Sequence, residues 1–512
     1  MSSVAGPDDW GRSVFRFLAR SVAGAKFFAG PTGRVRLVLV AVFAVSRAVY
    51  WWAGVRFDAS GLTYSSQLLD PELLRNDLWT SLWYLHAQPP LFNLFVGLVL
   101  RWSPLAPPTS FHAAYVVLGL VLLFALHELG RLLRLGRVVA GVVAAVITCA
   151  PTTVLYENWL SYEYPVAVAL VVLVVLAGRY GVAPNVGLLV GCAAVGSAAV
   201  LTRSLLHPVW LIGVVGVLLA YRWPPPRRAL IVGVPLLVVA GVMFKNQLLF
   251  GTPQLSSWFG FNLHRVVVEP LTDAQRAQLA EEGVGPVTAS PQPAPPCGLH
   301  HPQVPAVARQ YKHQGQLFDG APIENFNYEC VIEQYAGLAD ESVRVLRAHP
   351  RWYVRNVVGS AELWATPASL TPFVYYNRQE IGSLDEWYRR LVLLDVAWDP
   401  PVAIPGAWPV ALSAPDRRFH LSFTIVVATM VVSLAGLVGL VQWRRRNCAR
   451  LAVVIGGVTV GYVTAASIFL EFGENNRFRF IVEPLTFVLF AGVIGWAIRR
   501  LLAIRRRSSG QG

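Results

Sequence analysis

Charged residues are scarce in this sequence. Asp, Glu, Lys and Arg make up 14% of its 512 residues, whereas they form about a quarter of an average soluble domain. Hydrophobic residues reach 55%, and the mean hydropathy is +0.49. The scarcity of charge excludes an ordinary water-soluble protein and indicates a membrane protein.

Cysteine and lysine are also scarce. The five cysteines show no CxxC pair and no His-rich ligand spacing, which excludes a zinc module and a scaffold built on many disulfides. Only three of the 43 basic residues are lysines, and the formal net charge is +14. Because the arginines lie beside apolar runs, as the orientation rule for membrane helices requires, we do not expect nucleic acid as a partner.

Long apolar runs are abundant, and they determine the predicted fold class. Ten runs approach the length that a membrane crossing requires. They cover residues 35–53, 111–131, 138–155, 165–178, 185–206, 209–222, 229–248, 420–442, 451–470 and 480–498. We therefore predict an all-α polytopic membrane protein with about ten transmembrane helices, of which the first is an uncleaved signal anchor.

The basic residues alternate between the ends of these runs, which predicts the orientation. Clusters fall at every second helix end, at Arg34 and Arg36, Arg131 to Arg137, Arg179, Arg222 to Arg228, Arg444 to Arg450, and Arg499 to Arg507. Both termini should then lie in the cytoplasm, and the protein should reside in the cytoplasmic (inner) membrane with its site facing outside.

This orientation divides the chain into five parts, and the long loops among them are the expected functional segments. The parts are an amphipathic cytoplasmic segment (1–34), a seven-span module (35–249) with a first external loop (54–110), an external loop domain of mixed structure (250–419), three further spans (420–498) and a basic cytoplasmic tail (499–512).

Local patterns predict further structure in the two external segments. The apolar stretch 88–102 is too short to cross, so we expect an interfacial helix that begins at the proline pair Pro89 and Pro90. The segments 328–350 and 383–395 have helical patterns. Cys297 and Cys330 are the only cysteines predicted outside, and we expect a disulfide between them.

Acidic residues are concentrated in the first external loop. Asp58 lies a few residues beyond the first span and is either a general base or a helix cap. Asp70 precedes Pro71, a pattern that favours helix capping. As a carboxylate in the same loop, Asp70 is also the reserve candidate for the general base. His86 is either structural or a contact for phosphate or a sugar hydroxyl.

At this point the sequence resembles a known family, the GT-C glycosyltransferases, which take a sugar from a polyprenyl-phosphate donor. The shared features are an acidic residue just beyond the first span, juxtamembrane helices in the first external loop, a long external loop after the seventh span and a His-x-x-Pro-Pro-Leu element, here His86 to Leu91. The layout is most similar to the protein O-mannosyltransferases and the lipid A aminoarabinose transferase, although Asp58 is followed by Ala59 where the mannosyltransferases have an Asp-Glu pair. Glu474, Arg477 and Arg479 are similar to a C-terminal Glu-x-x-Arg element of bacterial members.

Sugar transfer from a phosphate carrier also requires cations that stabilise the departing phosphate. The predicted donor phosphate-binding residues are Arg47, Arg203, Arg477, Arg479 and His86. Arg47 is the most distinctive because a charge inside a span is energetically costly, with snorkelling to the headgroups as the alternative. Snorkelling is also the alternative for Arg203, and a plain ion pair with Glu474 is the alternative for Arg477.

Four polar residues are the expected substrate contacts, namely Glu157, Glu163, Glu474 and Gln88. Glu157 and Glu163 lie among aromatic residues that either anchor the chain at the membrane boundary or stack on a sugar. No spacing predicts a metal site, and no cofactor is expected.

These features predict an inverting glycosyltransferase that uses a polyprenyl-monophosphate sugar on the outer face of the membrane. Asp58 would be the general base, with Asp70 in reserve. The expected partners are the polyprenyl-phosphate sugar donor, membrane lipids and an acceptor that is an envelope glycan, a lipid or a protein. The alternatives are a transporter or flippase of lipid-linked sugars and a ligase for pyrophosphate-linked glycans.

Overall fold

The computed structural model describes residues 30–65, 67–222, 226–285, 287–288, 293–316, 321–398, 419–442 and 448–508. Most of these residues are helical, and the described strands form two small two-stranded sheets. The amphipathic segment predicted over residues 1–34 lies mainly outside the described residues.

Seven helices in the described part of the chain are long and apolar enough to cross a membrane, and an eighth crossing is possible if one bent pair forms a single span. The seven are α2 (Gly30–Trp52), α7 (Pro107–Leu132), α10 (Glu163–Val182), α13 (Pro226–Phe250), α22 (Phe423–Val441), α23 (Cys448–Leu470) and α25 (Glu483–Ser508). The bent pair is α8 (Arg137–Cys149) and α9 (Pro151–Glu157), with an angle of 58° between its helices. The protein is therefore an all-α polytopic membrane protein, as the sequence predicts.

Two shorter apolar helices, α11 (Val186–Thr202) and α12 (Pro208–Tyr221), coincide with the fifth and sixth predicted runs. They are too short to be counted as spans by length alone, so the predicted total of ten remains a prediction. The basic residues after Arg499 continue α25 as helix as far as Ser508.

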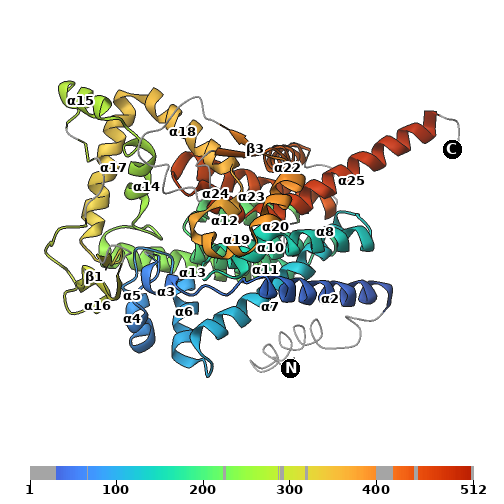
Figure 1. Ribbon diagram of the computed structural model, residues 1–512, viewed down its shortest axis with the longest axis horizontal. Coiled ribbons are helices and arrows are strands. Elements are labelled where there is room, and N and C mark those ends of the chain that lie inside the picture. Colours follow the sequence, from blue (N-terminus) through green and yellow to red (C-terminus); the bar gives the residue numbers. More distant parts are fainter. Residues whose placement is uncertain are drawn as a thin grey trace.

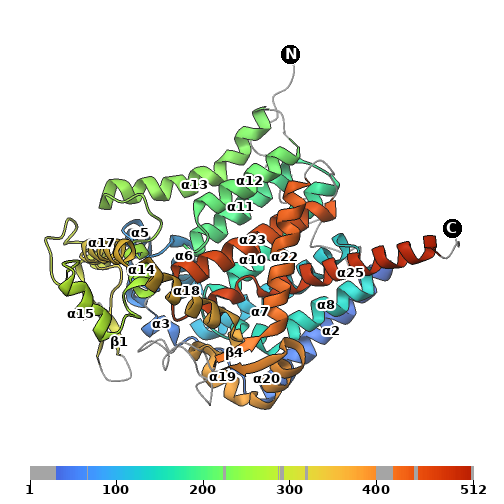
Figure 2. The ribbon, with the colours of Figure 1, turned by 90° about the horizontal axis from the view of Figure 1, so that it is seen from above.

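The helices pack around α10, which is buried along most of its length and contacts α7, α11 and α23. The first residue of α10 is Glu163, whose side chain is fully buried. The Gly30 end of α2 and the Ser508 end of α25 lie at one end of the molecule, and the helices α14, α15 and α17 lie at the other (Figure 1). Figure 2 shows the same separation from above.

Short helices connect α2 to α7. They are α3 (Gly61–Tyr64), α4 (Pro71–Asn76), α5 (Leu78–Trp83) and α6 (Pro90–Trp102). Helix α6 begins at Pro90, where the proline pair predicts its start, because proline has no backbone N–H to leave unpaired in the first turn.

The segment after α13 contains helices and both sheets. Its described elements are α14 (Phe259–Val267), α15 (Asp273–Glu281), α16 (Pro305–Ala308), β1 (Tyr311–Gln316), β2 (Pro322–Glu324), α17 (Val331–Ala348), α18 (Pro350–Ala365), η1 (Ala368–Leu370), η2 (Pro372–Val374), α19 (Tyr375–Glu380), α20 (Gly382–Tyr388), the π-helical turn η3 (Arg389–Leu393), β3 (Asp395–Trp398) and β4 (Phe419–Ser422). The helical pattern predicted near 328–350 corresponds to α17, and the pattern near 383–395 corresponds to α20, η3 and the start of β3.

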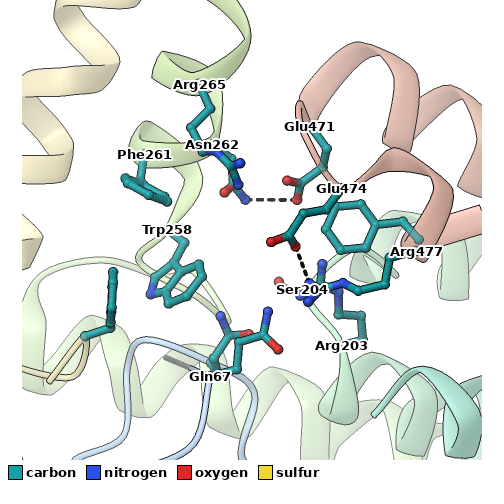
Figure 3. Close-up of a pocket in the computed structure, with 13 residues that line it drawn as sticks. Gln67, Arg203, Ser204, Trp258, Phe261, Asn262, Arg265, Glu471, Glu474 and Arg477 are labelled. Atoms are coloured by element: carbon teal, nitrogen blue, oxygen red, sulfur yellow. Dashed lines mark hydrogen bonds and ion pairs between the residues drawn. The ribbon is translucent and has the colours of Figure 1, made fainter. Parts of the chain in front are cut away.

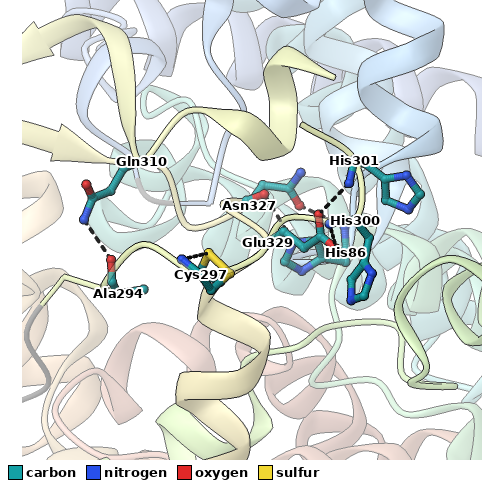
Figure 4. The surroundings of a disulfide bond; sticks show 9 residues. His86, Ala294, Cys297, His300, His301, Gln310, Asn327 and Glu329 are labelled. Atoms are coloured by element: carbon teal, nitrogen blue, oxygen red, sulfur yellow. Dashed lines mark hydrogen bonds between the residues drawn. A yellow bond between two sulfur atoms is a disulfide. The ribbon is translucent and has the colours of Figure 1, made fainter. Parts of the chain in front are cut away.

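A disulfide joins Cys297 to Cys330, the pairing that the sequence predicts, with 5.6 Å between the Cα atoms (Figure 4). Cys330 immediately precedes α17, and the bond ties the irregular, proline-rich segment before α16 to that helix. The same region is held by Glu329, whose carboxylate accepts hydrogen bonds from the backbone N–H groups of His300 and His301.

Candidate functional site

A polar cavity of about 210 Å³ lies where five separate segments of the chain meet (Figure 3). These segments are the connection between α2 and α7, the end of α11, the region of α14, the connection between β2 and α17, and the turn after α23 together with the short helix α24 (Asn475–Phe480). The lining residues are Gln67, Gln88, Arg203, Ser204, Trp258, Phe261, Asn262, Arg265, Phe326, Glu471, Glu474, Arg477 and Phe478.

The turn between α23 and α24 places two carboxylates and one guanidinium at this cavity. Gly473 has a φ of +97°, and a side chain there would come within 2.7 Å of Arg265 Nη2, so the turn requires glycine. Asn475 fixes the turn, since its side chain donates to the carbonyls of Ser467 and Glu471 and accepts from the N–H of Gly473. Glu474, the N-cap residue of α24, and Arg477, within α24, consequently both face the cavity.

Arg477 is the most strongly paired cation of the cavity. Its Nη2 lies 2.6 Å from Glu474 Oε2, and its Nε lies 3.2 Å from Glu163 Oε1. Burial opposes the charged form, but the carboxylates of Glu474 and Glu163 outweigh it and raise the pKa of Arg477 above its ordinary value. The guanidinium therefore stays charged while only 3% of the side chain is exposed.

Arg203 approaches the same cavity with a different set of contacts. Its guanidinium carbon lies 4.6 Å from the centre of the Tyr162 ring and 4.5 Å from that of Phe478, and its Nη1 donates to the Tyr162 hydroxyl. Its buried Nε has no hydrogen-bond partner in the described part of the chain. Aromatic rings therefore orient this cation and leave hydrogen-bonding capacity for a ligand.

Carboxylate and amide groups form the remaining polar wall. Asn262 donates to Glu471 Oε1 at 3.0 Å, and burial raises the pKa of Glu471. Gln88 and Gln67 line the cavity from the first segment, and the buried Oε1 of Gln88 has no partner among the described residues. Figure 3 shows Trp258 and Phe261 on the side opposite Arg203 and Arg477. The cavity thus offers cations, acceptors and aromatic faces, which together suit a polar anionic ligand with a flat or ring-shaped part.

A second cavity, of about 100 Å³, shares Gln67, Glu474 and Arg477 with the first. One of its walls is aromatic, because Trp159 and Phe373 stack with their ring centres 5.2 Å apart. The Arg477 guanidinium carbon lies 4.7 Å from the centre of the Phe373 ring. Glu474 and Arg477 therefore stand between a cationic cavity and an aromatic one.

Asp58 lies beside the second cavity and does not line either one in the part of the chain that the structure describes. Its backbone pairs with the strand-like segment before α10, since Asp58 N–H donates to Asn158 O at 2.8 Å and Leu160 N–H donates to Asp58 O at 2.9 Å. Its Oδ1 accepts from the N–H of Ser60 at 2.8 Å and from the Ser60 hydroxyl. The contact with Ser60 N–H is that of an Asx turn, and the N-cap residue of α3 is Ser60 rather than Asp58.

Two other predicted residues of the first loop have structural contacts. Asp70 caps α4 by accepting from the N–H of Glu72 at 2.9 Å, and it also accepts from the N–H of His313 at 2.6 Å. The His86 ring is buried against Ser257 Oγ at 3.0 Å and Asn327 O at 3.2 Å. Burial lowers the pKa of His86 to about 3, so the ring is neutral. The ring also does not line the cavity. Its predicted role as a phosphate ligand has no support from this geometry.

Two of the predicted phosphate-binding arginines are engaged with carboxylates away from the cavity. Arg47 contacts Glu157 through Nε at 2.9 Å and Nη2 at 2.6 Å. Arg479 lies 3.1 Å from Glu483 and donates to the carbonyls of Trp364 and Thr366, each at 2.8 Å. Of the predicted set, the structure brings together Arg203, Arg477, Glu163, Glu474 and Gln88.

The sequence reasoning missed the cavity residues contributed by α14 and its surroundings, such as Trp258, Asn262 and Arg265. No periodicity or motif in that segment distinguishes them, because their role depends on contact with residues about 200 positions later. Glu471 was detectable, since it lies three residues before Glu474.

No group of three or more His, Cys, Asp or Glu side chains suited to a metal ion occurs within the described residues. Comparisons with protein-family models, curated proteins and solved structures found no match to this chain.

Proposed function

We propose that the protein is a membrane glycosyltransferase that moves a sugar from a polyprenyl-monophosphate donor to an envelope glycan, a lipid or a protein acceptor. The observation that carries this proposal is the cavity in which Arg203 and Arg477 adjoin Glu474, amides and aromatic rings. The resemblance of segment 58–94 to GT-C enzymes, stated above, agrees with it. We further propose that the cavity opens on the outer face of the cytoplasmic membrane.

The cations account for binding and leaving-group stabilisation in this proposal. Guanidinium groups bind phosphate oxygens with short, charge-assisted hydrogen bonds. Arg203 is suited to this role because its Nε is unpaired, and Arg477 is suited because neighbouring carboxylates keep it charged. A fixed cation at the glycosyl phosphate stabilises the negative charge that develops as the bond from the anomeric carbon to the phosphate oxygen breaks.

Asp58 is the proposed general base, since a carboxylate must accept the proton of the acceptor hydroxyl. Its backbone is bonded to the segment that holds Trp159 and Leu160, two lining residues of the smaller cavity. In this arrangement the smaller cavity receives the acceptor, and the reaction is a single displacement that inverts the anomeric centre. Asp70 is a weaker candidate because its carboxylate caps α4.

The test uses the purified chain in nanodiscs with a panel of synthetic polyprenyl-phosphate sugars, and it measures donor consumption and glycosylated products by mass spectrometry. Asp58→Asn keeps an oxygen that can accept from Ser60, so we expect normal folding with turnover reduced by ~10²–10⁴. Arg344→Gln is the matched control, because it removes an exposed charge on α17 away from both cavities.

Two results would contradict the proposal. Near-normal turnover of Asp58→Asn would remove Asp58 as the base and leave the turn contact with Ser60 as its role. Failure to consume any monophosphate-linked donor, combined with movement of lipid-linked sugar across a vesicle membrane, would identify a transporter instead.

A further inference from the structure

The helical segment formed by α20 and η3 has its polar and apolar sides reversed relative to a water-exposed helix. Its inward side is charged, since Asp385 is 1% exposed and Arg389 lies 3.1 Å from Asp385 Oδ2 and 2.7 Å from Asp395 Oδ2. Its outward side is apolar, and Trp387 and Leu391 are each 65% exposed.

The exposed apolar residues form one stripe, defined here as Leu384, Trp387 and Leu391. Successive members are three and four positions apart, so they lie on the same side of a helix. Leu394, just after η3, is also exposed. An outward stripe of this kind is unfavourable in water and stable against hydrocarbon.

The structure fixes the level of this stripe relative to a membrane span. Strand β3 follows η3, and its first residue Asp395 pairs with Ser422 of β4. The next residue, Phe423, begins the span α22 and is itself exposed. Since η3 also contacts α22, the stripe lies next to the end of a span.

The end of a second span lies at the same level. Asn377 of α19 accepts from the N–H of Arg56 at 2.9 Å and donates to the Arg56 carbonyl at 2.8 Å. Arg56 follows the last turn of α2, whose terminal Trp52 is 85% exposed. Figure 2 shows α19, α20 and β4 grouped beside α2 and the adjoining end of α22.

Charged groups border the stripe as they do in helices that lie on a membrane surface. Glu386 and Arg390 form an exposed ion pair on the same segment. Such residues stay at the level of the lipid headgroups while neighbouring aromatic and leucine side chains enter the acyl region. The stripe therefore lies beside the exposed ends of α2 and α22.

We propose that α20 and η3 form an interfacial helix whose stripe contacts the acyl chains of the leaflet that these ends of α2 and α22 reach. The occupant of this face is the lipid bilayer rather than a second copy of the chain or another protein. This inference is independent of the proposed sugar transfer.

The contact has a consequence for the smaller cavity. Phe373, one of its aromatic lining residues, belongs to η2, which leads directly into α19 at Tyr375. In the chain, only α19 and Ile381 separate this cavity wall from the proposed interfacial helix.

The test measures spin-label accessibility in full-length protein in nanodiscs that hold one copy of the chain. Labels are placed through Trp387→Cys and Leu391→Cys after the free cysteines have been replaced and the Cys297 disulfide kept. Two controls define the scale, namely Gln278→Cys on the exposed surface of α15 and Leu437→Cys on the exposed surface of α22. Power saturation then compares access of oxygen, which favours lipid, with access of a water-soluble nickel chelate.

We expect the oxygen-to-nickel accessibility ratio at positions 387 and 391 to exceed that at position 278 several-fold and to stay below that at position 437. A ratio equal to that at position 278 would show that the stripe faces water and would overturn the proposal. Exclusion of both reagents, with an immobilised spectrum, would also overturn it because another part of a protein would then cover the stripe.

A measurement on the unmodified chain guards against failure of the labelled variants to fold. Phospholipids that carry a photoreactive diazirine in the acyl chain are incorporated into the nanodiscs and activated by light. We expect mass mapping to find lipid adducts within residues 384–394. Adducts on α22 without any on this segment would contradict the inference.

Discussion

Arg47 and Arg203 are both predicted from the sequence to bind donor phosphate, yet their surroundings differ. Arg47 lines an apolar cavity of about 520 Å³, but its hydrogen-bonding groups are occupied, because its Nε and Nη2 bind Glu157 and its Nη1 donates to Ser46 Oγ and Thr148 O. Arg203 lines the polar cavity and has an unpaired Nε. Two arginines inside the helical bundle can therefore serve stability in one place and ligand binding in another, and the distinguishing property is whether hydrogen-bonding capacity remains.

The largest expected effect breaks the closed pair. Arg47→Met leaves the Glu157 carboxylate buried without its cation, which should destabilise the fold by ~3–5 kcal/mol. The double variant Arg47→Met, Glu157→Gln should recover most of this loss, since it removes the buried negative charge and keeps an acceptor for Tyr164. Thermal unfolding in detergent measures both. If the single variant unfolds like the wild type and only loses activity, Arg47 belongs with the ligand-binding arginines.

The second prediction tests the open arginine. Arg203→Gln should reduce turnover by ~10²-fold, in the range found when one donor to a developing negative charge is removed. Its stability should change little beyond the ring contacts, which contribute ~0.5–1 kcal/mol each. Turnover is measured with equal amounts of folded protein. A large loss of thermal stability with unchanged turnover per folded molecule would assign Arg203 to structure.

The third prediction concerns the pH dependence of stability and tests whether the buried His86 ring is neutral in the folded chain. The pKa of His86 is about 3 in the folded chain and lies below the ordinary value of 6.5, so its contribution to stability is present above pH 6.5. As the pH falls from 6.5 towards 3, this contribution is lost with a slope of at most about 1.4 kcal/mol per pH unit. His86→Gln should therefore show a flatter decline of unfolding temperature between pH 6.5 and 4.5. Parallel profiles for variant and wild type would contradict the assignment.

The smallest expected effect distinguishes the role of Asp70 from that of Asp58. Asp70→Ala removes a helix cap and should cost ~1 kcal/mol while leaving turnover nearly intact. Asp58→Asn should have the opposite profile under the proposed mechanism. Paired measurements of unfolding temperature and turnover decide between them, and a collapse of turnover in Asp70→Ala would make Asp70 a candidate base.

The sequence located the apolar helices well because a membrane span is a local property of about twenty consecutive residues. It also identified Arg47 as unusual, because the cost of a charge inside a span depends on its position along the helix. It did not identify the group that compensates this charge, because the cost of burying Arg47 is the same whether a ligand or Glu157 supplies the opposite charge. The partner is 110 positions away, and the packing of α2 against α8, which α9 follows, brings the two together.

The candidate site was predictable where its residues lie near one another in sequence, as with Glu474 and Arg477. The contribution of α14 was not, because its residues become lining residues only through a contact such as Asn262 with Glu471. Likewise, the backbone pairing of Asp58 with Asn158 and Leu160 has no local signature. Long-range contacts determine which polar residues share a cavity, and no local pattern in a single sequence reveals such contacts.

The cavity is built from residues 67–88, 203–204, 258–265, 326 and 471–478, and this order has a consequence for biosynthesis. During translation, Glu163 and Arg203 emerge and are placed in the membrane long before Arg477 and Glu474 exist. The buried carboxylate of Glu163 must remain without its final counter-ion until the turn after α23 has been made. The cavity is therefore completed only when α24 has been synthesised. A nascent chain that ends at α23 would have its earlier helices but would lack the Glu474 and Arg477 side chains of the cavity.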